Sequence, residues 1–184
     1  KMRKLTALVL SAALALGLCA VAPAAEHMSN FQKTASYTGQ FKDVWSGAWY
    51  ADSAKICYEY GLMQGTYGKF NPRGTVSVAE ALTLSCRIHE VYNNGKSAVK
   101  SGSGANWYRP YVEYAVKEGL IQAGDFDDYT RAATRAEVAY LFADALPPAE
   151  LHAVNRIDHL TDVLQGKYYH SIKQIERAEC RAIG

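Results

Sequence analysis

The stretch ATRAEVAYLF, residues 133–142, decides how this sequence is read, because a looser copy, VSVAEALTLS, stands at residues 76–85. In both copies a hydroxyl residue is followed three positions later by glutamate: the pairs are Ser77 with Glu80, and Thr134 with Glu137. In this capping-box pattern the hydroxyl accepts a hydrogen bond from the backbone N–H three residues on, and the glutamate accepts one from the N–H of the capping residue. The sequence therefore predicts that a helix begins at each copy.

An arginine, Arg135, follows the capping residue in the second copy, whereas Val78 holds that position in the first. A cation in the first turn of a helix opposes the helix macrodipole. The position makes sense if the guanidinium is directed at an anion, because helix N-termini bind anions and arginine pairs with carboxylates through two parallel hydrogen bonds. The alternative is an arginine that is merely tolerated on the surface.

The capping motifs belong to a longer internal repeat. WYADSAKICYEYGLMQG, residues 49–65, aligns with WYRPYVEYAVKEGLIQAG, residues 107–124. Each copy has a helical pattern of small and apolar residues, a glycine that ends the helix, and a loop rich in turn residues before the capping motif. The first helix of the first copy is expected from about Trp49 to Tyr60. A third copy begins at TDVLQGKYYHSIKQIERAEC, residues 161–180, with Lys167 at the position of the tryptophan.

The first 24 residues have the features of a secretory signal peptide: a basic start, an apolar run, and small residues at Ala22 and Ala24. An uncleaved membrane anchor is the alternative, because the apolar run is almost long enough to span a bilayer. A lipid on Cys19 is disfavoured by Leu18 before it. The formal charge of the chain is only +2, so no basic surface indicates nucleic-acid binding.

Three cysteines follow this segment: Cys57, Cys86 and Cys180. Cys57 and Cys86 are expected to be small buried residues of two helices, with a disulfide between them as the alternative. Cys86 and His89 lie one helical turn apart, but two ligands are weak evidence for a metal site. The DFDD stretch at 125–128 lacks the glycine and distal glutamate of a calcium loop. No metal or cofactor is therefore expected.

This ordered set of residues resembles the repeat of the S-layer homology (SLH) domain. The family pattern is F-x-D-V, a tryptophan that opens a helix, G-[IL]-x-x-G, F-x-P, and T-R-A-E opening a second helix. The matching residues are Phe41, Asp43, Val44, Trp49, Tyr50, Gly61, Leu62, Gly65, Phe70 and Pro72 in copy one, and Trp107, Tyr108, Gly119, Leu120, Gly124, Phe126 and residues 134–137 in copy two. Copy one has SVAE in place of TRAE, and copy two lacks the F-x-D-V opening.

The resemblance implies a mainly α fold of helix-loop-helix repeats packed as a pseudo-threefold SLH-type bundle, with the third repeat incomplete. The expected boundaries are a signal peptide at 1–24, an N-terminal linker at 25–40, SLH repeat 1 at 41–92, a linker at 93–104, SLH repeat 2 at 105–146 and a truncated SLH repeat 3 at 147–184. An incomplete bundle would leave an apolar face uncovered. The chain could then be a fragment, it could associate with another copy, or its third repeat could pack differently.

The resemblance also implies a secreted protein of the cell wall or cell surface. Its partner would be a secondary cell-wall polysaccharide, often one with a pyruvylated sugar, bound without covalent chemistry. A pyruvyl ketal carries a carboxylate, which suits the planar fork of Arg135. The expected ligand-binding residues are Arg135, Trp107, Trp49, Thr134, Asp43 and Arg73, and the expected capping residues are Ser77, Glu80, Thr134 and Glu137.

Several of these residues have a second interpretation. Each tryptophan could stack on a sugar ring or pack in the core at a repeat junction. Asp43 could accept from sugar hydroxyls or cap the turn before Trp49. Arg73 could substitute for the arginine that copy one lacks, or be an ordinary surface residue.

Two other function classes remain open. One is a secreted structural or protein-binding module that keeps the repeat fold. The other is the anchor fragment of a larger surface enzyme. The chain itself is not expected to be an enzyme, because its five histidines are scattered and no Ser-His-Asp or paired-carboxylate arrangement stands out.

Overall fold

The computed structural model describes residues 25–151 and 167–177. Its elements are α2 (Ala25–Met28), α3 (Ala51–Glu59), α4 (Val78–Asn94), the 3-10 helix η1 (Gly104–Asn106), α5 (Arg109–Lys117), α6 (Arg135–Ala143) and α7 (Tyr169–Arg177). Within those ranges the only extended pairings are two isolated bridges, so the predicted mainly α class is confirmed. The predicted signal peptide, Cys180 and part of the third repeat lie outside the described residues. Among the described helices, none has both the length and the apolar character needed to cross a membrane.

Glycine ends the first helix of each repeat. The chain turns left-handed at Gly61, with φ +70°, directly after α3, and at Gly119, with φ +78°, directly after α5. This conformation costs glycine little because it has no Cβ. The start of α3 differs from the prediction: the helix begins at Ala51 rather than Trp49, because residues 45–51 form two successive turns closed by bonds from Ala48 N–H to the Trp45 oxygen and from Ala51 N–H to the Ala48 oxygen.

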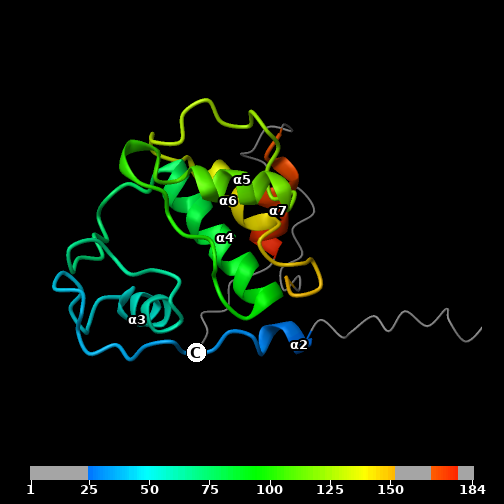
Figure 1. Ribbon diagram of the computed structural model, residues 1–184. Coiled ribbons are helices and arrows are strands. Elements are labelled where there is room, and N and C mark those ends of the chain that lie inside the picture. Colours follow the sequence, from blue (N-terminus) through cyan, green and yellow to red (C-terminus); the bar gives the residue numbers. More distant parts are fainter. Residues whose placement is uncertain (1–24, 152–166, 178–184) are drawn as a thin grey trace, which may run out of the picture.

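The core lies where α5 and α6 pack on α4, and α7 packs on α6 (Figure 1). Its buried residues are Val78, Ala81, Leu82, Cys86, Tyr111, Ala115, Leu120, Ile121, Phe126 and Leu141. Two hydrogen bonds cross it: the Ser85 hydroxyl donates to the Leu141 oxygen, and the Cys86 thiol lies 3.5 Å from the Tyr111 oxygen. The predicted second helices, α4 and α6, therefore meet in one core.

Helix α3 lies apart from this bundle (Figure 1) and has an aromatic cluster of its own. Phe41 is buried, and its ring centroid lies 5.4–5.6 Å from the rings of Tyr37, Tyr58 and Phe70. Just after α3, the Leu62 oxygen accepts a 2.8 Å hydrogen bond from Arg87 Nη1 of α4. The first helix of the first repeat thus lies outside the core formed by α4, α5 and α6.

The two cysteines in the described ranges are free thiols, so the disulfide alternative is not formed. Cys86 is fully buried, and burial raises the pKa of its thiol to about 12. Cys57 is half-buried, and burial raises its pKa as well. The prediction of small buried residues is therefore confirmed for Cys86 and holds in part for Cys57.

The starts of α4 and α6 are joined by their backbones. Ser77 and Ala132 form an antiparallel bridge. The N–H groups of Val78 and Ala79, the first two residues of α4, donate to the oxygens of residues 131 and 129 at 3.0 and 2.8 Å. The segment that leads into α6 therefore satisfies the free amides at the start of α4 and brings the two capping motifs side by side.

Candidate functional site

Both predicted capping boxes are present. At α6, the Thr134 hydroxyl oxygen accepts from the Glu137 N–H at 3.2 Å, and Glu137 Oε2 accepts from the Thr134 N–H at 2.8 Å. At α4, Ser77 and Glu80 make the same pair of bonds, at 3.2 and 2.8 Å. These four residues therefore have the structural role that the sequence predicts.

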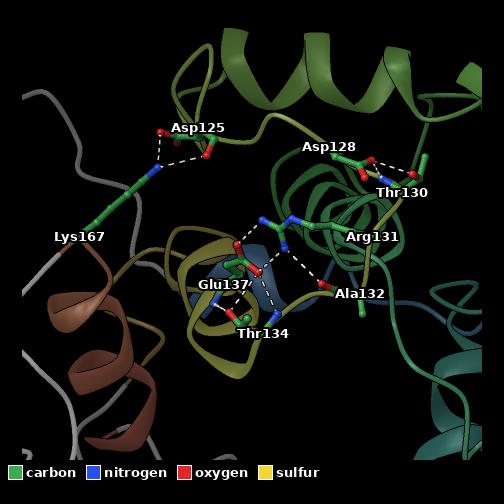
Figure 2. Close-up of polar contacts among 8 residues, drawn as sticks. All are labelled: Asp125, Asp128, Thr130, Arg131, Ala132, Thr134, Glu137 and Lys167. Atoms are coloured by element: carbon green, nitrogen blue, oxygen red, sulfur yellow. Dashed lines mark hydrogen bonds and ion pairs between the residues drawn. The ribbon is translucent and has the colours of Figure 1, made fainter.

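Glu137 has a second partner that sequence reasoning missed. Arg131 forms a two-pronged ion pair with it, with Nη2 2.6 Å from Oε1 and Nη1 2.9 Å from Oε2 (Figure 2). The hydrogen bonds from Arg131 are the main reason that the pKa of Glu137 falls to about 2. The carboxylate is therefore ionised and its charge is neutralised within the protein.

A short turn directs Arg131 toward Glu137. Asp128 Oδ1 accepts from both the N–H and the hydroxyl of Thr130 at 2.7 Å, and Arg131 Nη1 also donates to the Ala132 oxygen at 3.1 Å (Figure 2). The sequence signal for this arrangement is a D-x-T turn followed at once by arginine. Copy one lacks that signal, and Glu80 is exposed with no ion pair in the described part of the chain.

Arg135 has a different environment from Arg131. It is the first residue of α6, its side chain is exposed, and within the described ranges it forms no hydrogen bond or ion pair. Among those same residues, the N–H groups of Arg135 and Ala136 also have no protein acceptor, whereas the equivalent groups of α4 are both bonded. The start of α6 thus combines an unpaired guanidinium with two unbonded amides, an arrangement suited to an anion.

The remaining predicted ligand residues lie in separate places. Trp107 is half-buried and packs against the core cluster, whereas Trp49 is 93% exposed. Asp43 accepts from the N–H groups of Phe70 and Asn71 at 2.8 and 2.7 Å, so it caps the turn after Phe70 rather than one before Trp49. These bonds, chiefly the one from Phe70, lower the pKa of Asp43. Arg73 is exposed in the same loop.

The described residues contain no group of three or more His, Cys, Asp or Glu side chains placed to hold a metal ion. His89 instead pairs with Tyr114, with 2.7 Å between Nδ1 and the phenol oxygen, and burial is the main cause of its lowered pKa.

The comparisons with known proteins concern part of the chain. Residues 40–82 match the family model of the S-layer homology domain (SLH), a stretch that covers α3 and the first residues of α4. An exoglucanase, XynX, of Acetivibrio thermocellus is 27% identical over 116 residues, which cover 58% of this chain and 11% of the enzyme. An amylopullulanase of Thermoanaerobacterium thermosulfurigenes is 28% identical over 116 residues, covering 58% of this chain and 6% of the enzyme. The chain thus spans about a tenth or less of these relatives, and no solved structure matches it significantly.

Proposed function

We propose that this chain anchors to the cell wall at the cell surface by binding an anionic secondary cell-wall polysaccharide at the start of α6. The match of residues 40–82 to the S-layer homology domain supports the anchoring role. Domains of this family bind cell-wall polysaccharide. What we propose beyond this family property is that the glycan is anionic and that residues at the start of α6 bind it.

The observation that supports this site is that two nearby arginines have different partners: Arg131 pairs with Glu137, whereas Arg135 has no partner among the described residues. Arg131 neutralises Glu137, so the carboxylate of the capping box does not cancel the charge of Arg135. Arg135 then presents its full positive charge beside two unbonded amides. A carboxylate, such as that of a pyruvyl ketal, would be held by the guanidinium through two parallel N–H···O bonds and stabilised by the helix N-terminus.

The test is co-sedimentation of the protein with purified bacterial cell walls. Arg135→Lys keeps the charge but loses the two-pronged geometry, so wall affinity is expected to fall by roughly 1.5–3 kcal/mol, the range for a hydrogen bond to a charged group. The matched control is Arg109→Lys, because Arg109 is also an exposed first residue of a helix, α5, but has no capping box there. Equal affinities for the two variants would contradict the proposal.

A second experiment addresses the ligand. A pyruvylated saccharide is expected to release the bound protein from the walls, and the same saccharide without the pyruvyl group is expected to release much less. Release by both sugars alike would show that the carboxylate is not what the site recognises.

One alternative has a specific observation in its favour: the relatives with known names are long enzymes in which the matched stretch is a small part. The chain could then be the anchoring part of a surface enzyme. This alternative predicts the same wall binding and the same effect of Arg135→Lys, and differs only in what the wall-bound protein carries.

A further inference from the structure

The first repeat exposes three large aromatic side chains that no core uses. Trp45 is 69% exposed, Trp49 93% and Tyr67 98%. Aromatic rings of this size usually bury most of their surface, and exposed apolar patches commonly mark binding sites. Trp49 was already expected to meet a ligand, but neither Trp45 nor Tyr67 belongs to the repeat pattern.

Two adjoining segments, residues 42–49 and 66–71, carry these rings. Their backbones are tied by the 3.0 Å bond from Lys42 N–H to the Gly68 oxygen and by the Asp43 carboxylate, which accepts from the N–H groups of Phe70 and Asn71. Tyr67 stands in a turn closed by two bonds between Thr66 and Lys69, at 2.9 and 3.0 Å. The rings are therefore held by ordered backbone.

Ring contacts connect these segments to the buried aromatic cluster of the first repeat. The Trp49 ring meets Tyr50 edge-on at 5.5 Å, and Tyr50 stacks on Phe70 at 6.2 Å. Phe70 in turn contacts the buried Phe41 at 5.4 Å. The two segments are thus backed by packed rings.

The charges on these segments are mainly positive. Lys42 and Lys69 are exposed, and Arg73 follows in the same loop. Asp43 is the one acidic residue of the two segments, and its two oxygens are engaged by backbone N–H groups. These two segments therefore carry exposed apolar rings and exposed lysines.

We propose that Trp45, Tyr67, Lys42 and Lys69 form, with Trp49, a second contact surface for an acidic polysaccharide. Sugar rings have apolar C–H faces that stack on aromatic side chains, and the lysines would pair with the acid groups of the polymer. The choice of an acidic polymer rests on the proposed function, but the residues are distinct from the start of α6. Two contacts on one repeating polymer raise the overall avidity without a stronger single contact.

A first experiment uses tryptophan fluorescence with acrylamide as the quencher and polygalacturonate as the acidic polysaccharide. The chain has only three tryptophans, and the Trp45→Phe, Trp49→Phe variant isolates the signal of half-buried Trp107. We expect polygalacturonate to shield the intact protein from acrylamide and to leave the variant unchanged, while neutral dextran shields neither. The proposal would be overturned if polygalacturonate left the quenching of the intact protein unchanged. It would also be overturned if anionic lipid vesicles shielded the tryptophans and polygalacturonate did not.

A second experiment compares wall binding of variants. Trp45→Ala and Tyr67→Ala are each expected to weaken it by about 5-fold or more, the equivalent of one aromatic stacking contact. Val116→Ala on α5 and Lys96→Gln in the loop after α4 are the controls for lost apolar surface and lost charge. Gly47→Ala is a more specific variant, because it keeps every aromatic residue. The added Cβ would lie 2.2 Å from the Trp45 ring, so the ring must move.

The two proposals fail separately. If Arg135→Lys weakens wall binding and the Trp45, Tyr67 and Gly47 variants do not, the second surface is refuted and the first proposal stands. If those variants weaken binding and Arg135→Lys does not, the second surface is supported and the site at α6 is refuted.

Discussion

Replacing Arg131 with methionine is expected to destabilise the protein by about 1–2 kcal/mol, because it leaves the Glu137 carboxylate buried without its cation. Breaking a fully buried ion pair costs about 3–5 kcal/mol. Two observations reduce that figure here: the Arg131 side chain is 42% exposed, so water screens the pair, and Glu137 keeps its hydrogen bonds from Thr134. The fall in the pKa of Glu137 from 4.5 to about 2 corresponds to a net stabilisation of the carboxylate by about 3 kcal/mol, after the opposing effect of burial.

The effect should depend on pH in a defined direction. The pKa of Glu137 is lower in the folded state than in the unfolded state, so its stabilisation is complete above about pH 4.5 and is lost as the pH falls toward 2. In Arg131→Met the folded-state pKa moves back toward 4.5. The variant should therefore lose less stability than the parent between pH 4.5 and pH 2, and the two unfolding free energies should converge there.

The assay is urea unfolding of both proteins at several pH values between 2 and 7. Arg135→Met is the matched control, because Arg135 lies on the same helix but has no partner among the described residues, and its stability should stay within about 0.5 kcal/mol of the parent. If Arg131→Met and Arg135→Met have the same stability and the same pH dependence, the ion pair has no energetic role and the neutralisation of Glu137 loses its support.

Three further predictions concern stability. Leu82→Ala, in the fully buried core of α4, should cost about 2–5 kcal/mol in urea unfolding, and a loss below about 1 kcal/mol would contradict the packing of α5 and α6 on this helix. Ser77→Ala removes the hydroxyl of the α4 capping box and should cost about 1 kcal/mol by the same assay, with Ser53→Ala, an exposed position inside α3, as the control. Lys167→Gln removes the 2.6 Å ion pair with Asp125 and the contacts with three aromatic rings, so limited proteolysis should cut near α7 sooner than in the parent; equal cleavage rates would mean that this lysine does not hold the helix.

Local signals predicted the elements well. The S/T-x-x-E pattern located the starts of α4 and α6, because a capping box is closed by residues three apart and needs no distant partner. Gly61 and Gly119 marked the ends of the first helices for the same reason, since a left-handed turn depends on one residue. The family match at residues 40–82 lies over the repeat that the sequence resemblance also identified.

The sites depended on tertiary structure and were harder to predict. Trp49 and Trp107 have the same position in the repeat, yet one is almost fully exposed and the other packs against the core. The difference arises because α5 packs on α4 whereas α3 stands apart, which no pattern within a single repeat encodes. The partnership of Arg131 with Glu137 likewise requires the turn at Asp128 to reverse the chain toward α6.

The backbone bridge between the two repeats has a consequence for the order in which the chain folds. The first two amides of α4 find their acceptors about fifty residues later, at positions 129 and 131. During synthesis or export, α4 stays without these acceptors until the second repeat has emerged, so its N-terminal turn is completed late by a contact of long sequence separation. A fragment that stops at residue 104 would fray at that turn. The second repeat is therefore needed to complete the helix start of the first repeat.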